Sequence, residues 1–202
     1  MPKKKRVLYP VVFMIAITAV FTLVLALINE VSSDRIEKQE MLKTQTKLLN
    51  SLNIEYDGND ESIIESYNKY ISQDNIDDID FYTASDNDSI MGYGFSVKGP
   101  GLWGSIEAFI ALDSNFEYIK GVDFITHSET PGLGGRIDEE WFLEQFRDIP
   151  IKDNSDGNHL VFKPSVGGNV DSISGATITS KAVLKLFNDN LNEILKLKED
   201  II

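Results

Sequence analysis

The chain has 202 residues, of which 42% are hydrophobic, and a formal net charge of −13. It contains no cysteine, which excludes iron–sulfur clusters, thioether-attached haem, disulfides and thiol catalysis, so any redox chemistry needs an organic cofactor. Two histidines are too few for a histidine-rich metal site, and an acidic chain is poorly suited to bind nucleic-acid phosphates.

The N-terminal segment has the composition of a membrane anchor. Residues 7–28 carry no charge, and about 20 apolar residues in an α-helix cross the hydrocarbon core of a bilayer. Lys and Arg at positions 3–6 predict a cytoplasmic N-terminus by the positive-inside rule. A cleaved signal peptide is the alternative, but the apolar run is long and no small-x-small cleavage site follows it. We therefore predict a cytoplasmic basic tip and a single transmembrane anchor over 1–28, with the rest of the chain extracytoplasmic in the cell membrane.

The next part of the chain is expected to be helical. Apolar residues at helical spacing predict a helix over 29–54, and a second, short helix is expected over 61–71. Residues 74–80 are acidic and are expected to be exposed. This pattern predicts a juxtamembrane helical segment over 29–75 and an extracytoplasmic domain over 76–202.

The pattern then changes to that of β-strands, with turn-forming residues between the runs. Strands are predicted over residues 81–84, 90–97, 106–112, 118–126 and 160–163. Short connections between sequential strands favour antiparallel pairing. A short helix over 138–146, with Asp138 as its N-cap, and a closing helix from Ala176 or Thr177 to about Lys198 complete the domain. The predicted fold class is α+β, an antiparallel sheet with flanking helices, plus the N-terminal transmembrane helix.

Three glycine-containing segments are candidates for a ligand site. The first, at 98–104, is by itself typical of a hairpin turn. The second, at 127–135, is a rigid glycine- and proline-rich loop at the end of a strand, which can be functional or an ordinary connection. The third, at 171–180, precedes the closing helix, where Ser174 or Thr177 can be a simple N-cap. The same geometry also suits a phosphate, because free N–H groups and the positive end of the helix dipole face an anion.

The sequence DSISGATITS at 171–180 resembles the flavinylation motif of the FMN-binding domain found in NqrC and RnfG. These are the membrane-anchored flavin subunits of the Na⁺-pumping NADH:quinone oxidoreductase and of the Rnf ferredoxin:NAD oxidoreductase. The ETPGLG loop at 129–134 and the GLW turn at 101–103 resemble the same family, in the same order. The similarity spans about residues 90–190 and includes the single N-terminal anchor.

The resemblance implies a covalent flavoprotein. Thr177 would accept FMN in a phosphoester bond, formed by an ApbE-type flavin transferase that moves FMN from FAD with Mg²⁺. The other implied cofactor-binding residues are Ser174, Gly175 and Ala176 around the phosphate, Thr179 and Ser180 with nearby hydroxyls, Asp171 for the transferase, and Glu129, Thr130, Leu133, Gly134 and Trp103 along the isoalloxazine. Glu129 could lower the flavin potential or serve as a structural hydrogen-bond acceptor. Neither a catalytic residue nor a metal ligand is expected in this chain.

The implied function is electron transfer within an ion-translocating oxidoreductase complex of the Rnf or Nqr type, with other membrane subunits as partners. The chain would be a subunit of that enzyme and would not be catalytic alone. The Gly-Leu-Trp-Gly turn and the long helix after the anchor favour NqrC, whereas the short length and His127 favour RnfG. A stand-alone flavinylated extracytoplasmic electron carrier and a non-catalytic sensory or structural ectodomain that binds flavin are the alternatives.

Overall fold

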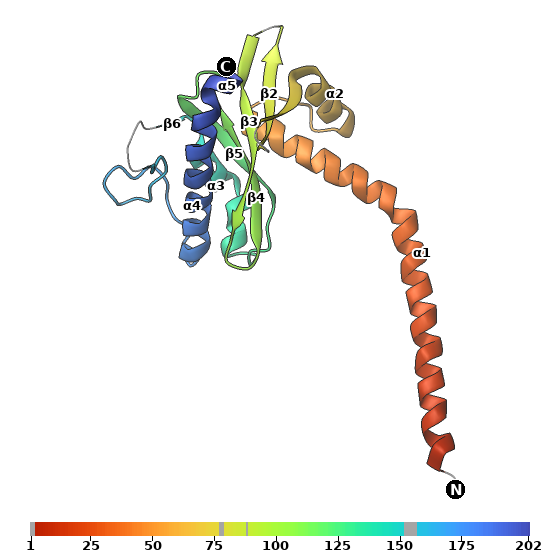
Figure 1. Ribbon diagram of the computed structural model, residues 1–202. Helices are drawn as coiled ribbons and strands as arrows, with labels where there is room; N and C mark the ends of the chain where they lie inside the picture. Colours follow the sequence, from red (N-terminus) through yellow and green to blue (C-terminus); the bar gives the residue numbers. More distant parts are fainter. Residues whose placement is uncertain (1–2, 77–78, 88, 152–156) are drawn as a thin grey trace. The chain divides into compact units, whose positions relative to one another are not determined.

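The computed structural model describes the chain except for residues 1–2, 77–78, 88 and 152–156, and describes only the backbone of residues 3–7. The chain divides into two compact units, Met1–Met41 and Leu42–Ile202, and the division falls within helix α1 (Lys3–Leu52) (Figure 1). The residues of the predicted juxtamembrane segment from Leu42 onward therefore belong to the globular unit.

The N-terminal unit contains the apolar part of α1. Its hydrophobic side chains are exposed on every side, with Leu8, Phe21 and Leu25 each 65% exposed. The most apolar window of this helix has a mean hydropathy of 3.0, and none of it is buried. A helix that is apolar on all faces is stable in lipid rather than in water. The predicted N-terminal apolar helix is thus confirmed, and its length and composition suit it to cross a membrane.

The globular unit begins with the C-terminal part of α1 and with α2. Local capping contacts end the first of these helices and start the second. Asn53 terminates α1 in the left-handed region, at φ 58°, and the N–H of Ile54 donates back to a carbonyl of the last turn. Helix α2 (Asp60–Tyr70) is capped by Asn59, whose Oδ1 accepts a 2.8 Å hydrogen bond from the N–H of Ser62. The two predicted helices are confirmed, the second ending one residue early.

A meander of antiparallel strands forms the centre of this unit. Among the described residues the strands are β1 (Ile71–Ile76), β2 (Ile79–Asp86), β3 (Ser89–Pro100), β4 (Ser105–Leu112), β5 (Tyr118–Thr126) and β6 (Ile149–Pro150). They lie in chain order, each antiparallel to the next. The predicted antiparallel sheet is confirmed.

Three details of the strand prediction are wrong. The segment that begins at Ile71 is an edge strand rather than a helix end; its polar, exposed sequence carries no strand-like alternation. The short strand β6 was not predicted. The strand expected over 160–163 does not form, because Phe162 makes only an isolated bridge to Val170.

The helices after β5 are short except for one. They are a 3₁₀ turn (Gly134–Asp138), α3 (Glu140–Leu143), a second 3₁₀ turn (Glu144–Phe146), α4 (Thr177–Ile194), a third 3₁₀ turn (Leu195–Leu197) and α5 (Lys198–Ile201). The single helix predicted over 138–146 is therefore divided into short pieces. Asp138 is not its N-cap: Glu139 precedes α3, and the Asp138 carboxylate lies 2.9 Å from His127 Nε2.

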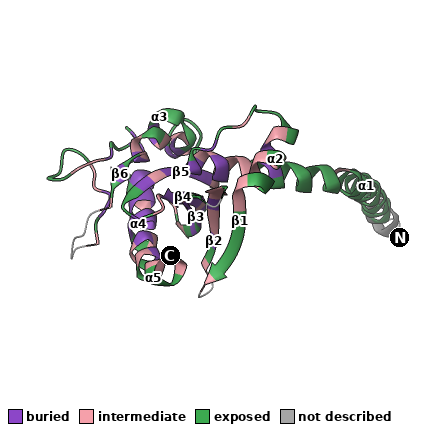
Figure 2. Cartoon of the chain, turned by 90° about the horizontal axis from the view of Figure 1, so that it is seen from above, coloured by how far each residue is buried: buried purple, intermediate pink, exposed green. Residues whose placement is uncertain are grey.

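Both faces of the sheet are covered, which gives three layers. On β4, Ile106 and Ile110 pack with α4, whereas Phe109 and Ala111 pack with α2 and the end of α1. Figure 2 shows the buried residues concentrated where α4 meets the central strands. Phe187 of α4 is fully buried in this core. Successive side chains of β4 point to opposite faces of the sheet, and both faces are buried. The sequence of β4 is therefore almost continuously apolar.

A buried ion pair joins the last turns of α1 to β5. Asp123 is 1% exposed, and its Oδ1 lies 2.8 Å from Lys47 Nζ. Its Oδ2 accepts a 3.1 Å hydrogen bond from Asn50, whose own side chain accepts one from Tyr56. Because both oxygens of the buried carboxylate have partners, this polar group is compatible with an apolar core and sets the position of the helix on the sheet.

Candidate functional site

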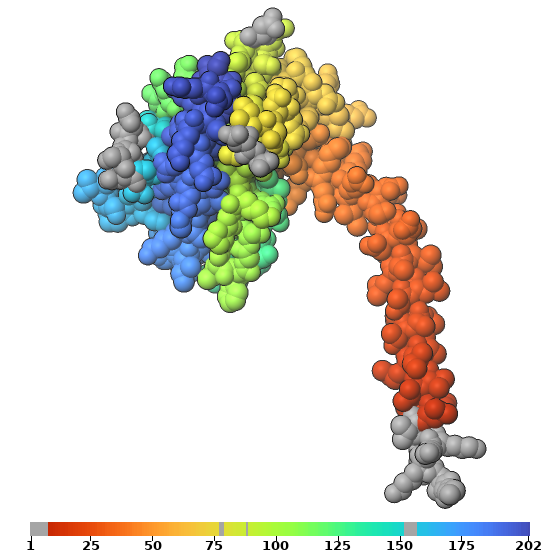
Figure 3. Space-filling model, viewed as in Figure 1, coloured from red at the N-terminus to blue at the C-terminus, as the bar shows by residue number. Residues whose placement is uncertain are grey.

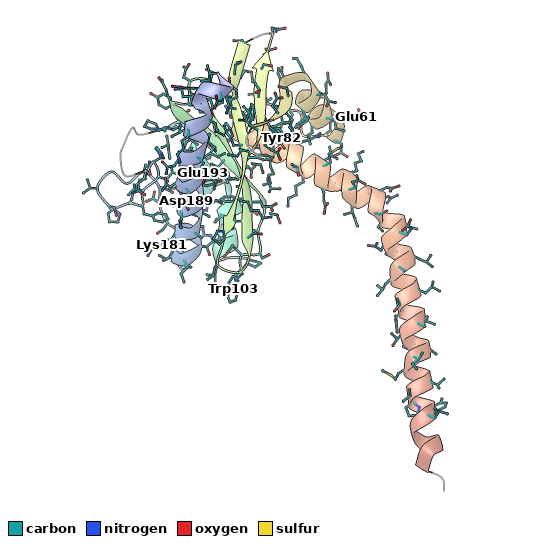
Figure 4. All side chains as sticks on the ribbon, in the orientation of Figure 1. Glu61, Tyr82, Trp103, Lys181, Asp189 and Glu193 are labelled. Carbon is teal, nitrogen blue, oxygen red and sulfur yellow. The ribbon has the colours of Figure 1, made fainter. Side chains whose placement is uncertain are left out.

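The three glycine-containing segments lie at one end of the sheet. The β3–β4 turn joins Pro100 to Ser105 at this end, and β5, antiparallel to β4, returns to it with Thr126 opposite Glu107. Figure 4 shows Trp103 of the turn and Lys181 of α4 at the same end of the unit. The meander therefore brings together segments that are distant in the sequence.

Glu129 connects these segments through its carboxylate. Oε1 accepts hydrogen bonds from the backbone N–H groups of Leu102, at 2.6 Å, and Trp103, at 3.3 Å. Oε2 accepts a 2.7 Å hydrogen bond from the hydroxyl of Thr179 in the first turn of α4. The Glu129 N–H in turn donates to His127 Nδ1 at 3.2 Å. The side chain is 5% exposed, so these contacts are shielded from water.

Two glycines leave room for this carboxylate. A Cβ on Gly101 would lie 2.5 Å from Glu129 Oε1, and a Cβ on Gly134 would lie 2.7 Å from Oε2 and 2.6 Å from Thr179 Oγ1. None of these distances is sterically possible for a side chain, so Gly101 and Gly134 are required by their close approach to the carboxylate.

The start of α4 is shaped by a turn over 173–180. Gly175 has φ +78°, which places the chain in a conformation that favours glycine. Ser180 Oγ accepts from the N–H of Ile173 and donates to the carbonyl of Ala176, both at 3.0 Å. Ala176 is the N-cap residue and makes no side-chain cap. The simple N-cap interpretation of Ser174 and Thr177 is therefore wrong.

Thr177 is exposed at the first position of α4, a helix of 18 residues. In the described part of the chain no side chain caps this helix, so the N–H groups of its first turn are available to an external acceptor. The positive end of the helix dipole lies at the same place. The Thr177 hydroxyl is thus accessible where a phosphate is best stabilised.

Several other predicted residues lie differently from Thr177. Thr179 and Ser180 are buried, and their hydroxyls donate to protein oxygens, so neither proton is available to a phosphate. Asp171 is exposed and pairs with Lys163 at 3.0 Å. The remaining loop residues differ in burial: Ser174, Gly175 and Thr130 are exposed, whereas Ala176 and Gly134 are buried.

Exposed apolar side chains lie on the segments that meet at the start of α4. Trp103 is 68% exposed, Ile178 62% and Leu133 47%, and a Cβ on Gly175 would lie 3.4 Å from Leu133 Cδ2. Figure 3 shows the start of α4 (blue) beside the β3–β4 turn (yellow-green) at the lower end of the view. Such a group of exposed apolar side chains is typical of a site that binds a ligand or another protein.

A groove borders this group and contains residues that the sequence analysis did not select. It has a volume of about 500 Å³ and is lined by the end of β3 and by α4, including Ile178 and Lys181. Lys181 follows Thr177 by one helical turn and is exposed on the same face. Its four-residue spacing from Thr177 is the signal by which it could have been found.

Comparison with known proteins identifies the family. Residues 101–192 match the model of the FMN-binding domain. Over 192 residues, which are 90% of this chain and 85% of the relative, the chain is 33% identical to the G subunit of an ion-translocating oxidoreductase complex from Aliivibrio fischeri. The chain belongs to the FMN-binding domain family. The region that matches the FMN-binding domain contains the GLW turn, the 129–134 loop and the 171–180 motif.

Two solved structures of NADH-quinone reductase C subunits share the fold. The crystal structure of the C subunit of the Na⁺-translocating NADH-quinone reductase from Parabacteroides distasonis superimposes with a TM-score of 0.66 and 26% identity, over 81% of this chain and 95% of that chain. NqrC from Shewanella oneidensis superimposes with a TM-score of 0.59 and 18% identity, over 77% of this chain and 98% of the other, and this likeness concerns the fold alone.

Other relatives are matched only in part. The G subunit of an ion-translocating oxidoreductase complex from Methanosarcina acetivorans is 40% identical over 48% of this chain and 47% of its own length. The C subunit of the Na⁺-translocating NADH-quinone reductase from Yersinia pestis is 34% identical over 48% of this chain and 38% of its own length. The chain thus spans about half the length, or less, of these two curated relatives.

The residues present fit FMN. The uncapped start of α4 offers N–H groups to a phosphate, and open space at Gly132, where a Cβ would meet nothing within 4 Å, lies in the loop that carries Leu133. The exposed Trp103 and Leu133 offer apolar surface to a flat ring system. The donor set is therefore of the kind that binds a phosphorylated aromatic cofactor.

Proposed function

We propose that this chain is a membrane-anchored electron-transfer subunit that carries FMN in a phosphoester bond on Thr177. The observation that carries the proposal is the exposed Thr177 hydroxyl at the uncapped start of α4, within the segment that matches the FMN-binding domain. The anchor over residues 1–28 would place the N-terminus in the cytoplasm and the globular unit outside it, because the positive charges precede the apolar stretch.

Attachment of the cofactor is a phosphoryl transfer. The Thr177 oxygen attacks the phosphorus of the FMN half of FAD, a new P–O bond forms, and the bond to the AMP half breaks. AMP leaves, and the hydroxyl proton passes to a base of an ApbE-type flavin transferase, which supplies Mg²⁺. In this chain, the N–H groups of the first turn of α4 and the cation of Lys181 would offset the charge of the phosphate. Asp171, exposed at the beginning of the 171–180 motif and paired with Lys163, would be contacted by the transferase.

The covalent bond retains the cofactor where free FMN is scarce, because retention no longer depends on an equilibrium with the medium. When bound, FMN supplies one- and two-electron transfer, and the protein supplies position and surroundings. Trp103 and Leu133 would hold the ring at the surface of the unit, where a partner can approach it. This arrangement suits a carrier that exchanges electrons with other proteins rather than one that encloses a substrate.

The partners would be the other membrane subunits of an ion-translocating oxidoreductase complex of the Rnf or Nqr type. Support comes from the near full-length similarity to one component of such a complex from Aliivibrio fischeri. Copurification of these subunits through an affinity tag on this chain tests the proposal. Recovery of flavinylated chain without any of them would favour the stand-alone carrier.

The test of the acceptor residue uses the full chain expressed with and without a flavin transferase. After denaturation, wild-type protein from the transferase strain should fluoresce in the gel, and the peptide that contains Thr177 should carry the mass of FMN less one water. Thr177→Val should abolish both signals, whereas the matched control Thr126→Val, exposed at the end of β5, should retain them. Labelling that survives in Thr177→Val would refute Thr177 as the acceptor.

A further inference from the structure

Glu129 is a cross-link between three segments that are distant in the sequence. Its carboxylate accepts hydrogen bonds from residues 26, 27 and 50 positions away. Both oxygens are used, and every donor belongs to the protein. A contact set of this kind constrains the relative positions of the β3–β4 turn, the 129–134 loop and the first turn of α4.

The carboxylate has no space for a ligand atom. Its exposed fraction is 5%, and the glycines at 101 and 134 approach it so closely that even a methyl group on either would overlap an oxygen. A flavin ring resting on the outer surface of the loop would therefore contact its exposed neighbours and not Glu129 itself. This differs from the expectation that Glu129 lies along the isoalloxazine.

The contacts of Glu129 lead directly to the groups that would touch the cofactor. Thr179, its partner in α4, follows the proposed acceptor Thr177 by two residues in the same helical turn. Glu129 also accepts a hydrogen bond from the backbone N–H of Trp103. The side chain of Trp103 is the most exposed of the apolar side chains near the site. One buried group is thus bonded to the backbone of Trp103 and to the helical turn that carries Thr177.

We propose that Glu129 is a positioning residue for flavin attachment: its buried carboxylate holds the Trp103 turn against the start of α4, so that Thr177 and the apolar side chains face the same ligand. This rests on the proposed attachment of FMN to Thr177. Since the carboxylate acts through geometry, a side chain of the same shape that still accepts from the turn and bonds to Thr179 preserves its action.

The substitutions E129Q and E129L distinguish the hydrogen bonds made by the Glu129 side chain from its packing alone. The amide oxygen of glutamine can still accept from the two N–H groups of the turn, and its NH₂ can donate to Thr179 Oγ1. Leucine has a similar size but no acceptor. The control is E117L, which removes an exposed carboxylate at the β4–β5 turn, at the opposite end of the sheet.

The experiment measures the rate of FMN incorporation into full-length protein in detergent, with purified flavin transferase, FAD and Mg²⁺. E129L should be labelled about tenfold or more slowly than wild type, which corresponds to a transfer barrier raised by roughly 1.4 kcal/mol. E129Q and E117L should be labelled at rates within about threefold of wild type. In the unlabelled proteins, hydrogen exchange at the Leu102 and Trp103 amides should be faster in E129L and unchanged in E129Q.

The outcomes distinguish this inference from the proposed function. If wild-type protein takes up no FMN, the attachment to Thr177 fails; if wild type is labelled and E129L is labelled as fast, the positioning role of Glu129 fails. Loss of labelling in E129Q with amide protection retained would also overturn it, because charge rather than geometry would then be required. If E129L does not fold, the variants T179V and T179S test the inference instead. Slow labelling of T179V, with the wild-type rate recovered in T179S, supports it. Equal labelling rates of T179V and T179S refute it.

Discussion

Replacement of Gly134 by alanine should destabilise the globular unit through the buried carboxylate. The added Cβ would lie 2.6 Å from Thr179 Oγ1 and 2.7 Å from Glu129 Oε2, two atoms that are hydrogen-bonded to each other. Both residues are buried, so the conflict is relieved only by a strained core or by loss of that hydrogen bond. Overpacking costs about 1–3 kcal/mol and a hydrogen bond to a charged group about 1.5–3 kcal/mol, so we expect a loss of about 2–4 kcal/mol.

Thermal unfolding of the full chain in detergent, followed by tryptophan fluorescence, measures this loss. For a unit of this size, each kcal/mol lowers Tm by about 2–4 °C. The matched control is Gly132→Ala in the same loop, where a Cβ meets nothing within 4 Å and only the φ of +74° is unfavourable. That strain costs about 1–2 kcal/mol. A Gly134→Ala protein that melts no lower than Gly132→Ala would refute the steric argument.

Two further predictions concern ion pairs. Lys47→Met should lower the free energy of unfolding by about 2–3 kcal/mol, because Asp123 is left buried without its cation. The control Lys98→Met removes the exposed partner of Glu107 and should change the free energy of unfolding little. Equal losses in the two variants would contradict the reasoning. The pKa of the Glu139 carboxyl lies below its usual value, chiefly because the Arg136 side chain donates a hydrogen bond to it. The contribution of this pair to the stability of the fold is therefore present above the usual pKa of a glutamate. It is lost as the pH falls through the lowered pKa. In Arg136→Ala the NMR titration midpoint of Glu139 should move up, and an unchanged midpoint would disprove the cause.

The elements that could be predicted are those whose own residues carry the pattern. The apolar stretch of α1 and the alternating or continuous apolar runs of β3, β4 and β5 predict their structure because burial selects the side chains along each of them. Strand β1 could not be predicted in this way. Its sequence, ISQDNI, is exposed at the edge of the sheet, and pairing with β2 rather than burial makes it a strand.

Some features of the candidate site could likewise be predicted from the sequence, and others could not. The motif at 171–180 indicated the start of a helix, since helix termini depend on local residues, and the family resemblance selected Thr177. The roles of the neighbouring hydroxyls could not be inferred, because Thr179 and Ser180 differ from Thr177 only in the direction in which the helix turns them. That Thr177 accepts FMN stays a prediction.

The sequence by itself determined the class of this protein: an apolar helix before an acidic α+β domain, with three short motifs of an FMN-binding family. Those features are local, and each is encoded by residues within one segment. Only the tertiary structure decided that the three motifs meet, and that one buried carboxylate, Glu129, joins them. Its partners are brought to it by the order and direction of the strands, and a contact between distant segments leaves no periodic signal in either of them.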